Sequence, residues 1–258
     1  MKNTILSQKD LALLEQIVLH YSKIVSFEQI QEAIGNEISD GAARKWVAEL
    51  TQAGWLIRLK KGLYLVVTDI STLGFIDVSE LTIAQALIGD SYIAFDAALQ
   101  YHGMFDQMLA RIDSVTKGTT KAYKVGQTIY QFSHIKEDLY FGFNEETLGN
   151  DQVKIAHAEK ALLDMLYFRT SDYAVSLVLE KLQDYQEELD FARLKAYSLR
   201  FSLGTVRKLG FLLDQVGVET ADLIAQSNVK ENSYNRLTHE ADQFNAKWRL
   251  YYDSQTFG

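Results

Sequence analysis

Signals for helix starts alternate with apolar stripes over the first 67 residues, and this pattern constrains the fold more than any other feature of the chain. Ser7, Ser26 and Ser39 each stand where a helix N-cap is expected, because a serine oxygen can accept a hydrogen bond from a free backbone N–H. Apolar residues then recur at intervals of three to four, which is the period of a helix with one buried face. The sequence therefore predicts three amphipathic helices, of which the second and third end at Gly35 and Gly54.

Two runs rich in β-branched, aromatic and leucine residues follow the third predicted helix. They cover residues 55–59 and 63–67 and flank the turn Lys60-Lys61-Gly62, which is a typical hairpin pattern. Three helices followed by a hairpin predict a winged helix-turn-helix.

In that architecture the third helix lies in the DNA major groove and the hairpin contacts the phosphate backbone. Arg44 and Lys45 fall on the outer face of the third predicted helix, and the Ser39 hydroxyl precedes it. Cations also cluster at the hairpin, where phosphate contacts would supply affinity. The predicted DNA-binding residues are Ser39, Arg44, Lys45, Arg58, Lys60 and Lys61. An alternative is a protein-docking module, since winged helices serve that role as well.

The charge distribution indicates a boundary near Val67. The whole chain of 258 residues carries a net charge of −8, which argues against a surface coated by nucleic acid. The first 67 residues are nevertheless slightly basic, whereas the remainder is strongly acidic. We therefore predict a DNA-binding domain over residues 1–67, a linker over 68–78 and a second domain over 79–258.

The second part mixes strand-like and helix-like patterns, which predicts an α+β domain with a small sheet and packed helices. Helical spacing begins near Leu81, returns at His157 and lasts to about Gln226, with Gly204 and Gly217 as candidate helix ends. Strands are predicted over residues 112–115, 122–125, 128–132, 139–143 and 153–155.

One segment of this acidic part is basic. Between Phe191 and Leu213 there are five cations and no acidic residue, namely Arg193, Lys195, Arg200, Arg207 and Lys208. One hypothesis is a second DNA contact that follows the backbone of a bent duplex. The alternative is that these side chains are solvated, or paired with Glu187 and Glu188.

The sequence contains no complete motif of the enzyme classes that we considered. The chain contains neither cysteine nor proline, so His157 and Glu159 cannot belong to a zinc deaminase motif, which also needs P-C-x-x-C. Glu159, Lys160 and Asp164 are instead predicted to form the polar face of a helix. The five histidines have no metal-ligand spacing, and phosphate-binding glycine motifs are absent. We expect no enzymatic activity, no cofactor and no metal.

Aromatic residues of the second part leave another function open. They could form a base-stacking platform for RNA, although half or more are expected in the core. The set comprises Tyr92, Phe95, Tyr101, Tyr123, Tyr130, Phe132, Tyr140 and Phe141.

The longest unbroken apolar run covers only residues 63–67, which is too short for a membrane helix. The polar residues after Lys2 leave no apolar region of a secretory signal. We therefore expect a cytoplasmic protein.

Several segments, in their order and spacing, resemble the AbiEi antitoxins of bacterial abortive-infection systems, which defend against phage. The resemblance covers nearly the whole chain and also includes the hairpin that ends in Lys61-Gly62-Leu63-Tyr64. The other segments are SYIAFDAAL at 91–99 with YHG at 101–103, AEKALLD at 158–164, RKLGFLL at 207–213 and WRL at 248–250. The family often has proline near the positions of Glu80 and Thr238, where this chain has none.

The resemblance implies an antitoxin of a type IV toxin–antitoxin system. Its carboxy-terminal domain would counter a nucleotidyltransferase-like toxin, AbiEii, without requiring a stable complex. Its amino-terminal domain would repress its own operon by binding inverted-repeat operator DNA, with two copies of a monomeric protein on the DNA. The alternative is a single-component transcriptional regulator whose second domain senses a ligand or binds a protein.

Overall fold

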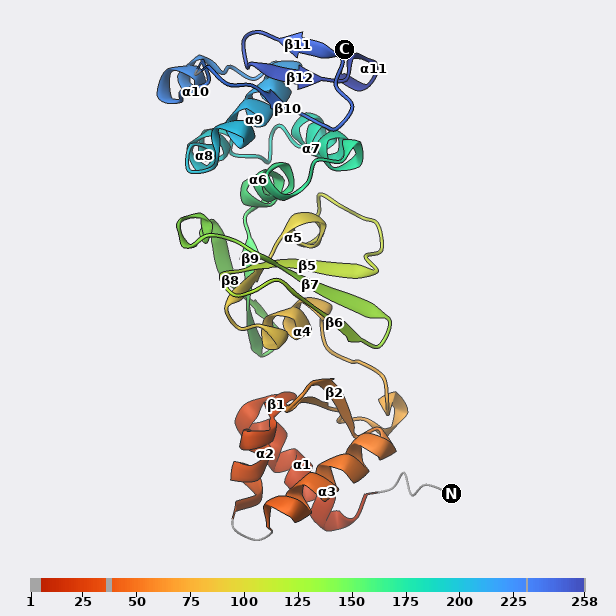
Figure 1. Ribbon diagram of the computed structural model, residues 1–258. Helices are drawn as coiled ribbons and strands as arrows, with labels where there is room; N and C mark the ends of the chain where they lie inside the picture. The colour runs from red at the N-terminus through yellow and green to blue at the C-terminus, as the bar shows by residue number, and fades with distance from the viewer. Residues whose placement is uncertain (1–5, 36–38, 231, 258) are drawn as a thin grey trace.

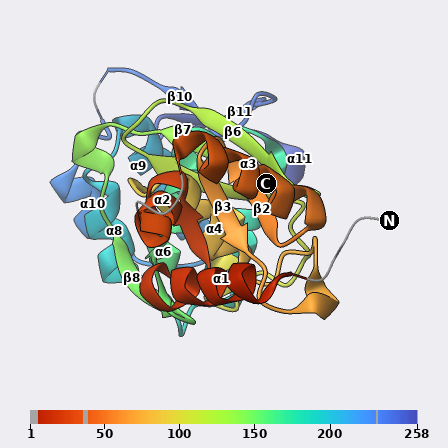
Figure 2. The same cartoon turned by 90° about the horizontal axis from the view of Figure 1, so that it is seen from below.

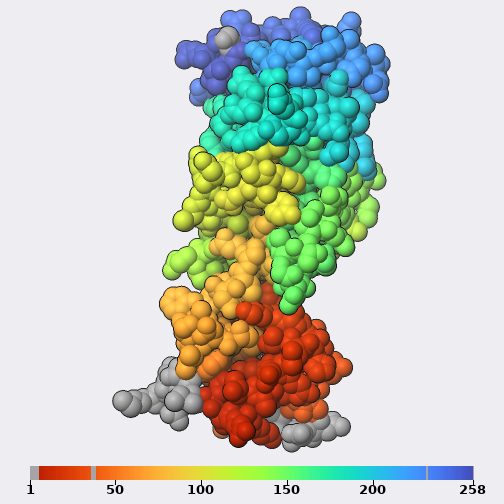
Figure 3. Space-filling model, turned by 180° about the vertical axis from the view of Figure 1, so that it is seen from behind, coloured from red at the N-terminus to blue at the C-terminus, as the bar shows by residue number. Residues whose placement is uncertain are grey.

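The computed structural model describes residues 6–35, 39–230 and 232–257. It is a mixed α+β structure in which successive parts of the chain follow one another from one end of the molecule to the other (Figures 1 and 3). Three helices and a small sheet form the N-terminal end. A six-stranded sheet occupies the middle, and helices with a second small sheet form the C-terminal end.

The three helices and the hairpin predicted in the N-terminal region are present. The helices are α1 (Gln8–Tyr21), α2 (Phe27–Ile34) and α3 (Asp40–Ala53). Each begins after its predicted serine, whose side chain accepts a backbone hydrogen bond. The hairpin consists of β2 (Leu56–Lys60) and β3 (Leu63–Val66), and a strand that was not predicted, β1 (Ile24–Ser26), pairs with β3 to give the antiparallel order β1-β3-β2.

This hairpin contributes to two separate clusters of buried apolar residues. Leu56 and Val66 pack with the three helices, whereas Leu59 and Leu65 belong to the larger cluster formed by the rest of the chain. In the view from below, the helices lie in front of β2 and β3 (Figure 2). The sheet is therefore placed between the N-terminal helices and the central part of the molecule.

The central sheet has the strand order β6-β7-β5-β4-β9-β8 and contains parallel and antiparallel pairs. Helix α4 (Glu80–Leu87) contacts β4 and β9, and α5 (Phe95–Tyr101) contacts β5 (Figure 1). The strands are β4 (Ser91–Ile93), β5 (Arg111–Thr116), β6 (Lys121–Val125), β7 (Thr128–His134), β8 (Phe143–Leu148) and β9 (Asp151–Ala156). The predicted strand at 139–143 was wrong, because this segment follows a short 3-10 turn and β8 starts at its last residue.

Five helices cover the end of the central part, and a small sheet of order β10-β12-β11 packs on them. Gly217 follows α9 with a φ of 73°, as predicted for a helix end, but Gly204 lies inside that helix. The helices are α6 (Ala158–Phe168), α7 (Asp172–Asp184), α8 (Phe191–Ser198), α9 (Leu203–Gln215) and α10 (Ala221–Gln226). The last elements are β10 (Asn235–Arg236), β11 (Gln243–Asn245), β12 (Leu250–Tyr252) and α11 (Ser254–Phe257).

Within the described ranges, none of these helices combines the length and the apolar character that crossing a membrane requires.

Candidate nucleic-acid interface

Helix α3 presents the polar face that its sequence predicted. Ala43, Val47 and Leu50 are buried, so Arg44 and Lys45 point to solvent. The Ser39 side chain accepts a hydrogen bond from the Ala42 backbone N–H at 3.4 Å, which caps the helix. The first half of α3 thus starts at a capped end and carries two exposed cations.

Arg44 and Lys45 differ in the neighbours that their charged groups contact. The Arg44 guanidinium carbon lies 4.8 Å from the centroid of the Phe27 ring, a cation–π contact that orients its planar group. The Lys45 ammonium lies 3.8 Å from the Glu49 carboxylate, and both side chains are largely exposed. Such an exposed pair is weak and screened by salt, so Lys45 remains available to an anionic ligand.

The hairpin lines the other side of a shallow hollow next to α3. Arg58 and Lys61 are exposed, and Gly62 closes the turn with a φ of 76°, where a side chain would be strained. Two adjacent depressions of about 550 and 480 Å³ share residues of α3 and of the hairpin, namely Arg44, Val47, Arg58 and Tyr64. Four predicted cations, Arg44, Lys45, Arg58 and Lys61, therefore line these two adjoining depressions, together with two acidic side chains, Glu49 in the first and Glu28 in the second.

The structure separates Lys60 from this group, although the sequence predicted it as a DNA contact beside them. Its ammonium donates a hydrogen bond to the Leu87 carbonyl at the end of α4, at 2.5 Å. Desolvation, and secondarily the charge of Lys121, lower the pKa of Lys60. This side chain connects the hairpin to the central part of the chain.

The basic segment at 191–213 is not a continuous exposed patch, because two of its five cations are buried, which corrects the second DNA hypothesis for Arg207 and Lys208. Arg207 is fully buried, and its guanidinium donates to the Val229 carbonyl at 3.1 and 2.8 Å. Lys208 is also buried and donates to the Leu166 carbonyl at 3.3 Å, and burial lowers its pKa. Neither side chain can reach a DNA backbone in this structure.

The other three cations of that segment are engaged with neighbours. Arg193 lies 3.6 Å from Glu159 and 3.4 Å from Asp190, and Lys195 lies 2.6 Å from Asp222. Arg200 donates to the Asp138 carbonyl at 2.7 Å and stacks on Phe141. The contacts differ from the predicted pairing with Glu187 and Glu188, but they agree with the view that these cations are structural.

A buried polar cluster in the centre of the chain was missed by the sequence reasoning. Lys160 and Asp164 lie on α6 with no exposed surface, and Glu159 is nearly as buried, so the polar face predicted for this helix is inside the protein. Lys160 pairs with Asp164 and donates to the Tyr92 hydroxyl at 2.6 Å, and that hydroxyl donates to Asp164 at 3.0 Å. Desolvation lowers the pKa of Lys160 and raises that of Asp164.

The aromatic residues considered for RNA stacking are mainly core residues. Tyr92, Phe95, Tyr130 and Phe132 are at most 2% exposed, whereas Tyr101 is 38% exposed. His157 lies 3.0 Å from the Tyr197 hydroxyl and 3.0 Å from the Asn144 side-chain oxygen. In the part of the chain that the structure describes, no three His, Asp or Glu side chains gather as metal ligands would.

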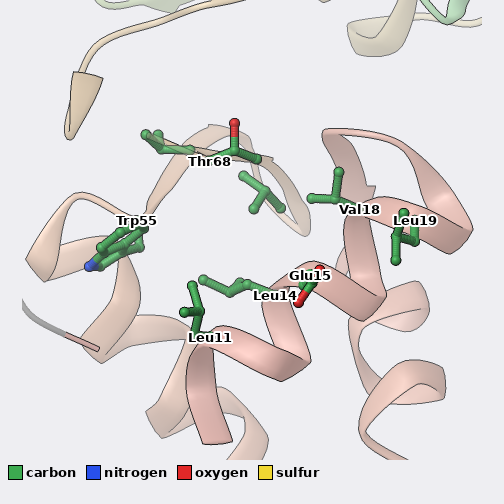
Figure 4. A pocket seen from close by; sticks show the side chains of 9 residues that line it. Leu11, Leu14, Glu15, Val18, Leu19, Trp55 and Thr68 are labelled. Carbon is green, nitrogen blue, oxygen red and sulfur yellow. The ribbon is translucent and has the colours of Figure 1, made fainter. Parts of the chain in front are cut away.

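An apolar groove of about 370 Å³ runs along α1 (Figure 4). Leu11 and Leu19 rise on its helix side with 53% and 77% of their surface exposed, and Trp55 and Thr68 line the other side.

Comparisons with known proteins support the fold. The structure resembles the crystal structure of the RV2827C protein from Mycobacterium tuberculosis with a TM-score of 0.65, covering 98% of this chain and 94% of that one. The two sequences are 14% identical. No family model and no curated protein matches the sequence. The shared architecture over both chains is an α+β fold, and at this identity the likeness concerns the fold alone.

Proposed function

We propose that the N-terminal region is a winged helix-turn-helix that binds duplex DNA through the hollow between α3 and the β2–β3 hairpin. The observation that carries this proposal is the convergence of four exposed cations, Arg44, Lys45, Arg58 and Lys61, from two elements around two adjoining depressions that share Arg44 and Arg58. An anionic backbone is the ligand class that such a surface favours.

The geometry divides the contacts into two kinds. Arg44 and Lys45 lie near the start of α3, the part of a recognition helix that reaches base edges, and arginine can pair with guanine through two hydrogen bonds. Arg58 and Lys61 lie on the hairpin, where contacts to phosphate add affinity without sequence preference. Ser39 adds a hydroxyl next to a helix N-terminus, which favours a phosphate.

The biological role that we propose is an antitoxin and autorepressor similar to AbiEi. The cytoplasmic protein would repress its own operon through this surface, with two copies on an inverted repeat, and would counter a nucleotidyltransferase-like toxin through its remaining part. Support comes from the order and spacing of the resembling segments, three of which are largely buried: β4 with α5, α6 and α9.

DNA binding is tested with the segment upstream of the gene as a labelled duplex. Arg44→Ala should weaken binding by about 1 to 3 kcal/mol, the range for a bidentate base contact. Lys136→Ala is the control, because Lys136 is also an exposed cation but lies between β7 and the short 3-10 turn that follows it, outside α3 and the hairpin. Equal affinities of the wild type and both variants would refute the assignment of α3.

The antitoxin role is tested by co-expression of the full chain with a nucleotidyltransferase encoded next to it. Wild type and Arg44→Ala should both rescue growth, because the proposal assigns the antitoxin activity to residues outside α3. A folded, abundant protein that fails to rescue growth would contradict this role.

A second candidate function, a ligand-sensing regulator, is favoured by one polar hollow of about 530 Å³ between the N-terminal region and the central sheet. An ion pair of 2.7 Å between Lys23 and Asp77 and a hydrogen bond of 3.1 Å from Ser22 to Asp151 border it. A ligand there would change operator affinity, and Asp77→Asn should remove that change while leaving basal DNA binding intact.

A further inference from the structure

The small C-terminal sheet carries a row of aromatic and cationic side chains across its outer face. Arg236 of β10 pairs in register with Tyr251 of β12, and Tyr251 pairs with Phe244 of β11. Residues that pair in register point to the same side of a sheet, so these three side chains share one face. Tyr234, directly before β10, extends the row.

The side chains of this row contact one another through their rings. The Tyr251 ring lies 4.9 Å from the Phe244 ring and 5.4 Å from the Tyr234 ring, measured between centroids. The Arg236 guanidinium carbon lies 5.4 Å from the Tyr251 centroid. Tyr251 is thus the centre of a continuous surface of three rings and one cation, which we call the aromatic row.

The opposite face of the same sheet holds the hydrophobic contacts. Leu250 is buried, and the Tyr252 ring packs on Phe211 of α9 at 4.8 Å. In contrast, Tyr234 and Phe244 are 62% and 44% exposed. The aromatic row is therefore not needed to fill the core, although cross-strand ring contacts also stabilise a sheet.

We propose that the aromatic row binds single-stranded nucleic acid, with bases stacked on the rings and a phosphate beside Arg236. Every nucleobase has a flat π-face, so exposed rings bind single strands with little sequence preference. Arg236 supplies the positive charge that the backbone requires, and arginine also stacks on bases. A duplex cannot use the surface in this way, because its base faces are already stacked on one another.

Both cationic and acidic side chains lie in the segments that form the aromatic row. Arg249, directly before Leu250 of β12, donates to the Ser233 carbonyl at 2.7 Å. Asp242, at the start of β11, accepts two hydrogen bonds of 2.8 Å from Ser254, and these lower its pKa and hold it at the edge of the sheet. Two further acidic residues of this region are Glu240, in the connection between β10 and β11, and Asp253, directly after β12.

The aromatic row and the duplex-binding hollow lie at opposite ends of the molecule (Figure 1). The new site therefore goes beyond the proposed duplex binding, and the two can fail independently. One end would hold an operator while the other end holds a single strand.

The test measures fluorescence anisotropy of a short labelled RNA of mixed sequence with the full-length protein. Tyr251→Ala and Phe244→Ala should each weaken RNA binding about 5- to 150-fold, the range of base–aromatic stacking contacts. Tyr251→Phe keeps the ring and should retain near wild-type affinity. Arg44→Ala should leave RNA binding unchanged, and Tyr251→Ala should leave duplex binding unchanged.

Tyr173→Ala is the matched control, because Tyr173 of α7 is 57% exposed outside the aromatic row. Thermal unfolding of each variant separates a folding defect from a binding defect, and Phe244→Ala provides a second variant if Tyr251→Ala does not fold. The proposal is overturned if RNA does not bind, as expected for a protein-docking surface. It is equally overturned if Tyr173→Ala weakens binding as much as Tyr251→Ala, or if the latter only lowers the unfolding temperature.

Discussion

Replacing Asp164 by Asn should destabilise the protein more than any exposed charge substitution. The Lys160 ammonium has no exposed surface, and Asp164 is the anionic partner that compensates it. Breaking a buried ion pair by removing one partner costs about 3 to 5 kcal/mol, since the other charge stays buried. For a chain of this size that corresponds to a loss of roughly 6 to 20 °C in unfolding temperature.

The rings around Lys160 reduce this cost without removing it. Its ammonium lies 4.9, 5.3 and 5.1 Å from the ring centroids of Tyr92, Phe141 and Phe201, and cation–π contacts contribute about 0.5 to 2 kcal/mol each. We therefore expect the lower half of the range for Asp164→Asn. Lys160→Met should cost less below neutral pH, because burial already raises the pKa of Asp164 and protonation can neutralise it.

The assay is urea unfolding followed by circular dichroism for the wild type, both single variants, and a triple variant. Lys160→Met, Asp164→Leu and Tyr92→Phe together replace all three polar groups by apolar ones and leave no unpaired hydroxyl. The triple variant should be more stable than Asp164→Asn, because well-packed apolar replacements of buried ion pairs are often neutral or stabilising. Additive losses, with the triple variant least stable, would refute the reasoning that the cost is an unpaired charge.

Three other predictions follow from individual contacts. Lys61→Met should weaken duplex binding and reduce the slope of its salt dependence by about 1. Lys60→Met should leave the affinity and the slope unchanged and should cost about 1 kcal/mol of stability. Fluorescence anisotropy across a salt series measures the first two quantities, and urea unfolding measures the third. Gly210→Ala would place a Cβ 2.2 Å from the Trp248 ring. Thermal unfolding should therefore show a loss of about 1 to 3 kcal/mol of stability, unless the variant yields no soluble protein at all. Burial lowers the pKa of His157 below its usual 6.5, so the unfolded state binds more protons between the two pKa values. Stability should therefore fall as the pH drops through 6.5, and urea titrations of His157→Gln should show a smaller fall.

The N-terminal region could be predicted from the sequence because its signals are local. A capping serine, a helical apolar stripe and a glycine end each act within a few residues, and the αL conformation of Gly54 ends α3 as expected. Strand β1 was not predicted, because three residues between two helices are too few to show an alternating pattern. The face of α3 that carries Arg44 followed from the helical period alone.

The central cluster could not be predicted, because its partners are distant in the sequence. Lys160 and Asp164 are four residues apart on a helix, which is also the spacing of an exposed surface pair. Inside the protein both side chains share a hydrogen-bond partner, the Tyr92 hydroxyl, and Tyr92 stands 68 positions before Lys160 in the sequence. Arg207 is a similar case, since its partners at Val229 and Asn235 come from a later segment.

The strands that carry the aromatic row were also beyond sequence reasoning. β10, β11 and β12 contain two or three residues each, which is too short for an alternating pattern to show. Only the register of Tyr251 with Arg236 and Phe244 places these side chains on one face.

The sharing of the hairpin between two apolar clusters changes what an isolated N-terminal fragment would do. Leu59 and Leu65 are 4% and 0% exposed, and both pack with the rest of the chain. Losing that contact forfeits up to roughly 3 to 6 kcal/mol, judged from about 1.5 to 3 for each buried leucine. A whole domain has only about 5 to 15 kcal/mol of stability.

We therefore expect a fragment of residues 1–78 to unfold at lower urea than the full chain and to associate as its concentration rises. Replacing both leucines by Thr in the fragment should suppress the association. A monomeric fragment with the unfolding midpoint of the full chain would show that the hairpin needs no support from the central part. The orientation of the cationic hollow would then be independent of the rest of the chain.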